Sequence, residues 1–202
     1  DDGRGIPVEF HPQLGFSTLE GVMTKLKFGG KFAAAEDAAA YRTSGGLHGV
    51  GVTVVNFLSE WCSVEVRRGG KTYTQEYERG VSTEPVIERG PADRRGTKTT
   101  FKPDPQIFPI TKFEYNILHR RMQELAFLNK GVRITLRDER TQEGDSFKYD
   151  LGVVEFVAHL NRAADPVHPD VIQFQRTQEG VEMDIALQYT GEYTENIHSY
   201  CN

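Results

Sequence analysis

The chain has 202 residues, of which 38% are hydrophobic, 10% aromatic and 26% charged. This composition is typical of globular domains and excludes collagen, coiled coils and disordered chains. No stretch approaches the roughly 18 consecutive apolar residues of a membrane span, and the N-terminus lacks a signal-peptide pattern. Cys62 and Cys201 have no Cys or His at metal-ligand spacing, so we predict neither a disulfide framework nor a zinc site. This cysteine usage favours a cytoplasmic protein.

The formal net charge of −5 is unevenly distributed along the chain. Lys and Arg are in excess by seven in residues 67–137, whereas Asp and Glu are in excess by three in residues 1–66 and by nine in residues 138–202. The basic middle is not interleaved with aromatic residues as in nucleic-acid-binding segments, so we expect solvated strand faces there, with a nucleic-acid groove as the alternative. The opening Asp1-Asp2-Gly3-Arg4-Gly5-Ile6-Pro7 is rich in turn residues, which predicts a chain that begins inside a domain.

The first third of the chain predicts two short helices. Ser17-Thr18-Leu19-Glu20 has the pattern of a capping box, and apolar residues then recur at helical spacing up to Gly29-Gly30. Residues 31–43 lack a repeating apolar face, which predicts a loop. A second helix is expected to begin within residues 46–51 and to end near residue 59, with an apolar face formed by Val50, Val54, Phe57 and Leu58.

From Trp61 the period of apolar residues changes to two, which is typical of strands. Cys62, Val64 and Val66 alternate with polar residues, and Gly69-Gly70 predicts a hairpin turn into a strand over 72–78. A further strand is expected over 97–102. It is followed by a long helix from a capping box at 111–114 to residue 129, and then by strands over 132–137 and 146–150.

The predicted fold class is α+β, with antiparallel or mixed strands and helices on one face, because no repeated strand–helix–strand spacing appears. The first domain is expected to cover residues 1–150. Residues 151–202 are predicted to begin a second α+β domain, with a helix over 153–161 and a hairpin of strands over 171–176 and 181–189. Apolar residues alternate along the last strand and lack a partner in the remaining chain, so we expect this domain to be truncated at Asn202.

The segment Ser44-Gly45-Gly46-Leu47-His48-Gly49-Val50-Gly51 is a loop with four glycines that runs into a helix. It fits neither the P-loop nor the dinucleotide-binding pattern, because the glycines that those patterns require are missing. Such a loop can present several backbone N–H groups to one anion, and the helix dipole favours negative charge there. The segment is therefore either a polyphosphate cradle or a turn needed for packing alone.

Asp1 lies ahead of two glycines, Gly3 and Gly5, which places a carboxylate acceptor beside uncovered main chain. This arrangement can read an amino group on a flat base, with Ile6-Pro7 as an apolar wall. The alternative is an Asx turn, which is the commoner explanation for an isolated D-x-G.

Taken in order, these segments resemble a known family. The D-x-G-R-G-I-P motif, Gly-Gly-Lys-Phe after the first helix, S-G-G-L-H-G-V-G-V and a distant Gly-Thr before a strand are similar to the ATPase region of the DNA gyrase B family. The S-G-G-L-H-G-V-G run is specific to type IIA topoisomerases within the GHKL group of ATP-binding proteins. The resemblance implies an internal fragment, in which a Bergerat-type ATP-binding α/β sandwich precedes the start of a transducer domain.

The resemblance also implies an ATP site. Asp1 would accept a hydrogen bond from the adenine amino group, with Gly5 and Thr97 in a water-linked cluster around the base. The base would be lined by Ile6, Pro7, Val22 and Met23. The phosphates would lie against Gly45, Gly46, Leu47, His48, Gly49, Val50 and Gly51. Lys31 would approach the nucleotide, Arg68 would lie at the pocket rim, and Arg4 would support the catalytic carboxylate.

For function, the resemblance implies the ATPase component of a bacterial type II DNA topoisomerase, which couples ATP binding and hydrolysis to strand passage and negative supercoiling. ATP and Mg²⁺ would be the cofactors, and DNA, the gyrase A protein and a second copy of the gyrase B protein the partners, with no membrane involved. The general base and the metal ligand of the family precede the D-x-G-R-G motif, so we expect the fragment itself to be inactive. The B protein of topoisomerase IV and a non-catalytic interaction module on the same scaffold are the alternatives.

Overall fold

The computed structural model describes residues 1–12, 15–28 and 49–201, and contacts between residues divide the chain into two units. The first unit holds Asp1–Thr111 with the chain end from Tyr200, and the second holds Lys112–Ser199. The two units divide between Thr111 and Lys112, whereas the sequence predicts a domain boundary at residue 150. That boundary stays a prediction. Within the described ranges, every helix is too short or too polar to cross a membrane.

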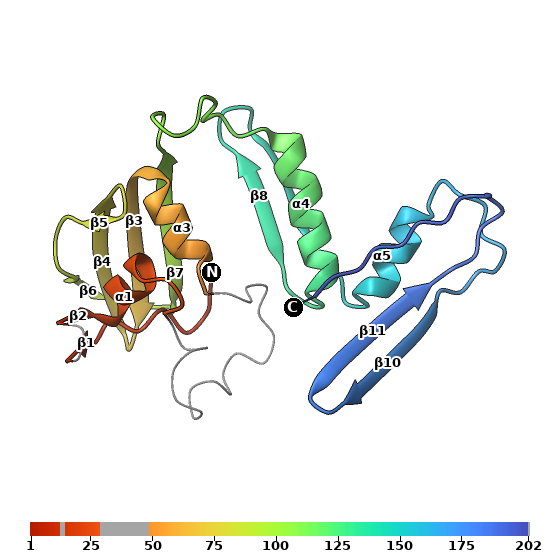
Figure 1. Ribbon diagram of the computed structural model, residues 1–202, viewed down its shortest axis with the longest axis horizontal. Helices are drawn as coiled ribbons and strands as arrows, with labels where there is room; N and C mark the ends of the chain where they lie inside the picture. Colours follow the sequence, from red (N-terminus) through yellow and green to blue (C-terminus); the bar gives the residue numbers. More distant parts are fainter. Residues whose placement is uncertain (13–14, 29–48, 202) are drawn as a thin grey trace. The chain divides into compact units, whose positions relative to one another are not determined.

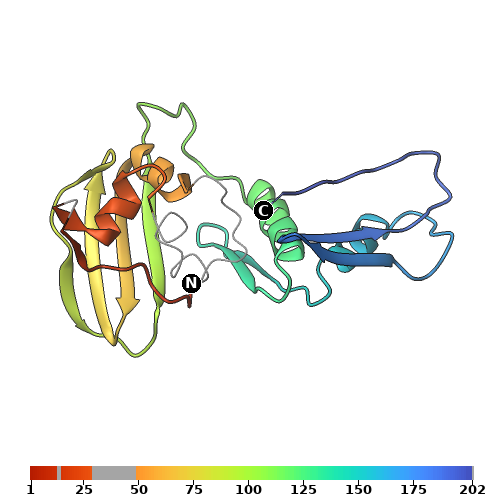
Figure 2. The same cartoon turned by 60° about the horizontal axis from the view of Figure 1, so that its bottom comes forward.

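A five-stranded antiparallel sheet forms the centre of the first unit (Figures 1 and 2). Its strands are β3 (Ser59–Arg68), β4 (Lys71–Glu78), β5 (Val81–Ser82), β6 (Ile87–Pro91) and β7 (Gly96–Pro103). β3 lies between β4 and β7, and β4 also pairs with β5 and β6. The predicted hairpin turn is confirmed: Gly69 and Gly70 join β3 to β4 with φ of 60° and 76°, values that glycine adopts at little steric cost.

Two helices, α1 (Thr18–Thr24) and α3 (Gly51–Phe57), lie on one face of this sheet (Figure 1). A short ladder of β1 (Phe10–His11) and β2 (Phe16–Ser17) leads into α1. The predicted start of α1 is confirmed, because the Ser17 hydroxyl accepts a hydrogen bond from the Glu20 N–H at 3.1 Å. This bond pairs one of the N–H groups that the first helical turn leaves open.

The core of the first unit lies between β3 and α1. Cys62, Val64 and Val66 alternate along β3 with no exposed surface and pack with Leu19 and Met23 of α1. Fully burying one such apolar side chain contributes about 1.5–3 kcal/mol. Burial also raises the pKa of the Cys62 thiol to about 11. The thiol therefore stays protonated at neutral pH and behaves as a small apolar side chain.

A buried polar network connects α1 to β4. Gln75 of β4 has no exposed surface, and its side-chain amide donates to Glu20 Oε2 at 2.9 Å and to the Glu84 carbonyl at 3.0 Å. Its Oε1 accepts a hydrogen bond from the Tyr77 hydroxyl at 2.8 Å, and burial raises the pKa of Tyr77. Because buried polar groups are costly when they lack a partner, this network fixes α1 against the sheet.

The buried face of α3 is polar, and the predicted apolar face is the less buried one. Val54 and Phe57 are 39% and 40% exposed, whereas Thr53 and Asn56 have no exposed surface. The two polar side chains donate hydrogen bonds to main-chain carbonyls of α1, which ends at Thr24 rather than near residue 29. Pairing the open carbonyls at the end of α1 therefore outweighs the burial of apolar groups on this face of α3.

The second unit contains two helices and two hairpins. α4 (Tyr115–Leu128) precedes the hairpin of β8 (Ile134–Asp138) and β9 (Glu143–Phe147), and α5 (Val153–Leu160) precedes the hairpin of β10 (Ile172–Gln178) and β11 (Val181–Leu187). Phe127 of α4 is 2% exposed; its ring stacks on Tyr149 with centroids 3.6 Å apart and lies 5.2 Å from the ring of Phe156 in α5. Helices together with antiparallel strands confirm the predicted α+β class.

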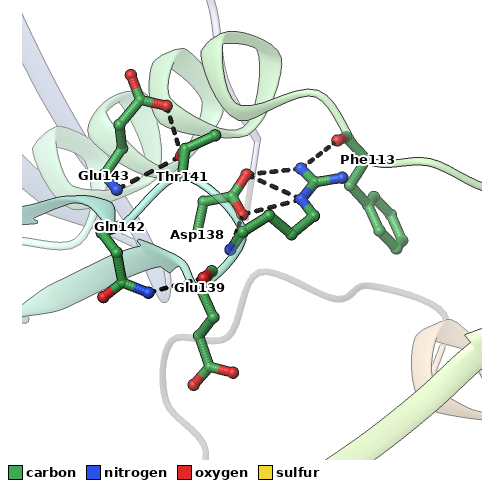
Figure 3. A network of polar contacts seen from close by, with 7 residues as sticks. Phe113, Asp138, Glu139, Thr141, Gln142 and Glu143 are labelled. Atoms are coloured by element: carbon green, nitrogen blue, oxygen red, sulfur yellow. Dashed lines mark hydrogen bonds and ion pairs between the residues drawn. The ribbon is translucent and has the colours of Figure 1, made fainter.

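A long-range contact holds the start of α4, in place of the predicted capping box. The N-cap residue is Glu114, which makes no side-chain capping bond. Instead, Arg140 in the turn between β8 and β9 donates to the Phe113 carbonyl at 2.8 Å and to Asp138 at 2.6 Å (Figure 3). The hydrogen bonds from Arg140 lower the pKa of Asp138 to about 2. This carboxylate therefore orients the guanidinium that holds the segment before α4.

Replacing Gln75 with Ala should lower the free energy of unfolding by about 2–4 kcal/mol, because Tyr77 and Glu20 lose a buried partner and a cavity opens. Urea unfolding at pH 7 measures the difference. Gln106→Ala is the matched control in the same unit, because Gln106 is exposed and its removal should change the free energy by no more than about 0.5 kcal/mol. Equal effects of the two changes would contradict the structural role of the network.

Replacing Asp138 with Asn should destabilise the second unit at pH 7, since Arg140 loses its charged partner. The native pKa of about 2 lies below the ordinary value of 3.8, so the stabilising effect is complete above pH 4 and is lost as the pH falls toward 2. The stability difference between the two proteins should shrink over that range in urea titrations. Asp150→Asn is the control, because this carboxylate is 71% exposed. An NMR titration that finds an ordinary pKa for Asp138 would refute the prediction.

Candidate functional site

The first five residues run along one end of the sheet in the first unit. Asp1 Oδ1 accepts a hydrogen bond from the Gly3 N–H at 2.9 Å and another from the Thr97 N–H at 3.0 Å. The bond to Gly3 is the Asx turn that the sequence offered as one interpretation. The bond to Thr97 additionally fixes the carboxylate to the start of β7. A carboxylate has about four acceptor sites, so these two bonds leave capacity for a further donor.

Two glycines permit this close approach of main chain to sheet. At Gly96, where φ is 140°, a Cβ atom would lie 2.0 Å from the carbonyl oxygen of Asp1. At Gly5, where φ is 77°, a Cβ atom would lie 2.8 Å from the Arg67 carbonyl oxygen. Both positions therefore require glycine for space as well as for backbone conformation. Gly96 entered the sequence-based prediction only as part of the Gly-Thr motif, without a role in the site.

Arg68 at the end of β3 holds the main chain of the same segment. Its Nη1 donates to the Gly5 carbonyl at 3.0 Å and to the Arg4 carbonyl at 3.4 Å, and its Nε lies 3.6 Å from Glu9 Oε1. The side chain of Arg4 is exposed. The structure thus brings Asp1, Arg4, Gly5, Arg68 and Thr97 together, as the resemblance implies, and it adds a main-chain anchoring contact for Arg68.

An open cavity of about 640 Å³ lies beside this segment and is lined by Asp1, Asp2, Arg67, Arg68, Gly69, Gly70, Ala92, Asp93, Arg94 and Arg95. Arg95 donates to the Asp2 carbonyl at 3.3 Å, so the loop before β7 also contacts the first residues. Elsewhere in the basic middle, basic side chains pair with acidic ones on the sheet, as in Lys71–Glu88 at 2.9 Å and Lys102–Glu60 at 2.7 Å. These exposed pairs fit the solvated strand faces expected from the sequence, where ion pairing contributes little to stability.

The residues predicted to line a base differ in burial. Ile6 is half-buried and packs against the core cluster, and Pro7 is also half-buried. In α1, Val22 is half-buried, whereas Met23 has no exposed surface and belongs to the core itself. Ile6 and Pro7 therefore lie at the edge of the core, and Met23 lies inside it.

The end of the predicted phosphate segment lies at the start of α3. Gly49 has a φ of 59°, Val50 is the N-cap residue without a side-chain capping bond, and Gly51 is the first helical residue. A Cβ atom at Gly51 would meet nothing within 4 Å. Among the described residues, no side chain caps the first turn of α3, and its N–H groups are the donors that an anion needs. Lys31, Gly45, Gly46, Leu47 and His48 lie outside the described residues.

The described ranges contain no cluster of three or more His, Cys, Asp or Glu residues placed to hold a metal ion. We therefore assign no metal ligand to these parts of the chain. The donors and acceptors that the structure does assemble, a fixed carboxylate and a helix start, fit a base and an anionic group.

Comparisons with known proteins identify relatives of the whole chain. A family model described as DNA gyrase B matches residues 152–202. The chain is 47% identical over 202 residues to the type 2 topoisomerase B protein of Aquifex aeolicus and 48% identical over 210 residues to the DNA gyrase B protein of Thermotoga maritima. Each alignment covers 100% of this chain but 25% and 32% of the relative, so the chain spans about a quarter to a third of the relatives' length.

A solved structure is similar in fold. The 43K ATPase domain of Thermus thermophilus gyrase B, in complex with an aminocoumarin, matches with a TM-score of 0.79 and 32% sequence identity. The match covers 96% of this chain and 48% of that chain. It agrees with the α+β class that the predicted elements indicated.

Replacing Gly96 with Ala should lower the free energy of unfolding by at least about 1 kcal/mol more than replacing Gly90 with Ala. Gly90 is a matched control, because its φ of 128° imposes similar backbone strain while a Cβ atom there would meet nothing within 4 Å. Urea unfolding of the two variants therefore isolates the contact with Asp1. If both variants were destabilised equally, the close approach of Asp1 to Gly96 would not contribute to the free energy of unfolding.

Proposed function

Because this chain belongs to the DNA gyrase B family, we propose that it is the nucleotide-binding part of the ATPase component of a type II DNA topoisomerase. In the full-length protein, ATP binding and hydrolysis would be coupled to DNA strand passage and supercoiling. The names of the relatives favour gyrase over topoisomerase IV. The observation that carries the proposal is the Asp1 carboxylate, fixed by the N–H groups of Gly3 and Thr97.

Adenine would be selected by hydrogen bonding at this carboxylate. The amino group of adenine is a donor, and Asp1 is an acceptor whose position is already set by main-chain N–H groups, so little ordering is needed on binding. Thr97 and Gly5 would complete the polar surroundings of the base, with Ile6, Pro7 and Val22 beside it. Guanine carries a carbonyl at the same position and would face the carboxylate with a second acceptor.

The phosphates would lie at the start of α3, against Gly49, Val50 and Gly51, with Gly45, Gly46, Leu47, His48 and Lys31 as further proposed contacts. Bound Mg²⁺ would neutralise phosphate charge, and we assign no ligand for it among the described residues. Arg4 would act by supporting a catalytic carboxylate. None of the described residues is assigned the role of general base, so the proposed hydrolysis is an activity of the full-length protein.

Partners and domain organisation are proposed on the same basis. DNA, the gyrase A protein and a second copy of the gyrase B protein would be the partners, and the location would be the cytoplasm. The free state of both cysteines supports a reducing compartment. We propose that a transducer domain begins near residue 151, and the start of the family match at residue 152 supports this boundary.

Asp1→Asn in the full-length protein should weaken binding of a non-hydrolysable ATP analogue by about 1–3 kcal/mol, or roughly 5- to 150-fold. The substitution keeps an oxygen for the Gly3 and Thr97 N–H groups but places an amide donor at the other position. Calorimetric titration in the presence of Mg²⁺ measures the change. The matched control is Asp2→Asn, because Asp2 is exposed and lines the same cavity.

Two results would count against this assignment. If Asp1→Asn binds the analogue as tightly as the unchanged protein does, Asp1 does not read the base. If the unchanged protein binds GTP as tightly as ATP, the site lacks base selection. Binding without hydrolysis by the full-length protein would instead favour the alternative of a non-catalytic module on this scaffold.

A further inference from the structure

Two polar side chains with no exposed surface join α3 to α1 in the first unit. Thr53 Oγ1 lies 3.0 Å from the Val22 carbonyl oxygen and 3.3 Å from that of Lys25, and Asn56 Nδ2 donates to the Met23 carbonyl at 3.1 Å. Thr53 and Asn56 are three positions apart in α3, so they lie on the same face of the helix. Thr53 shares its one hydroxyl proton between two carbonyls and Asn56 serves a third, all at or just after the C-terminal end of α1, where intrahelical donors are lacking.

The elements that these bonds connect carry different parts of the proposed nucleotide site. α1 contains Val22, which is proposed to line the base, next to Met23 in the core. α3 begins at Gly51, directly after Gly49 and Val50, where the phosphates are proposed to lie. The bonds from Thr53 and Asn56 are therefore the direct polar connection, within the described residues, between a base-binding helix and a phosphate-binding helix start.

Packing alone does not require this chemistry. Apolar side chains could fill the same space, and apolar contacts are non-directional, so they allow one helix to slide or rotate against the other. A hydrogen bond weakens steeply when its angle or length departs from the optimum, and it therefore fixes the position of one main chain against the other. Ser59, the first residue of β3, offers a comparison: it is 1% exposed, but its hydroxyl donates to the Val55 carbonyl of α3 at 2.6 Å and makes no bond to α1.

We propose that Thr53 and Asn56 are positioning residues that couple the base-binding part of the nucleotide site to the phosphate-binding part. The inference rests on the proposed function. With the two parts held at a fixed spacing, a ligand that engages both gains affinity that a ligand engaging the base alone does not gain. The coupling is thus visible as the ratio between the affinities for a nucleoside and for a nucleoside triphosphate.

The test compares adenosine with a non-hydrolysable ATP analogue plus Mg²⁺, both titrated calorimetrically into the full-length protein. Thr53→Val keeps the size and branching of the side chain but removes the donor. We expect the affinity for the analogue to fall by about three- to tenfold and the affinity for adenosine to fall by less than twofold, on the scale of one lost hydrogen bond. Thr53→Ser, which retains the hydroxyl, should restore the ratio of affinities.

Ser59→Ala is the matched control, because it removes a similarly buried hydroxyl that bonds to α3 but not to α1. It should lower thermal stability while leaving the ratio of affinities unchanged. If Thr53→Val fails to fold, Thr53→Cys replaces it, since a thiol is a weaker donor of similar size and should shift the ratio in the same direction.

An unchanged ratio in Thr53→Val or Thr53→Cys overturns the coupling, and so does an equal fall of the ratio in Ser59→Ala. Failure of the proposed function has a different signature. In that case the unchanged protein itself binds neither adenosine nor the ATP analogue.

Discussion

The pairing register between β3 and β7 determines where the proposed nucleotide site lies. Arg67 lies opposite Gly96 and Val66 opposite Thr97, so one end of the sheet presents a glycine followed by the N–H group that Asp1 binds. A slip of one residue would turn the apolar side chains of β3 toward solvent, which burial of that face forbids. The same slip would remove Gly96 from its place beneath Asp1. Burial of β3 thus fixes the register, and the register fixes the site.

Much of the fold could be predicted from the sequence because the interactions behind it are local. The alternation along β3, the turn at Gly69-Gly70 and the Ser17 cap each depend on residues a few positions apart. The wrong predictions concern places where a distant partner decides. The sequence around Thr53 does not indicate that its hydroxyl binds a carbonyl 31 residues earlier, and local patterns do not indicate that Arg140 holds the segment before α4.

The candidate site depended more on the resemblance than on local pattern. A D-x-G motif by itself indicates an Asx turn, and the structure contains that turn. The motif does not indicate that Asp1 also binds the start of β7. The motif order indicated that Asp1, Gly5, Arg68 and Thr97 belong together, and the structure brings them together. Their roles toward a nucleotide stay predictions. Gly96 was noted only as part of the Gly-Thr motif, because its requirement for glycine arises from Asp1, far away in the chain.

The same long-range contact has a consequence for the order of folding. The hydrogen bond between Asp1 and Thr97 spans 96 residues, whereas β3 and β4 are joined by a two-residue turn. Loop-closure entropy rises with the length of the loop, so we expect the β3–β4 hairpin to form early and the first residues to dock late. The carboxylate proposed to read adenine would then gain its position after the sheet is complete. A partly folded chain would accordingly have no means of selecting a nucleotide.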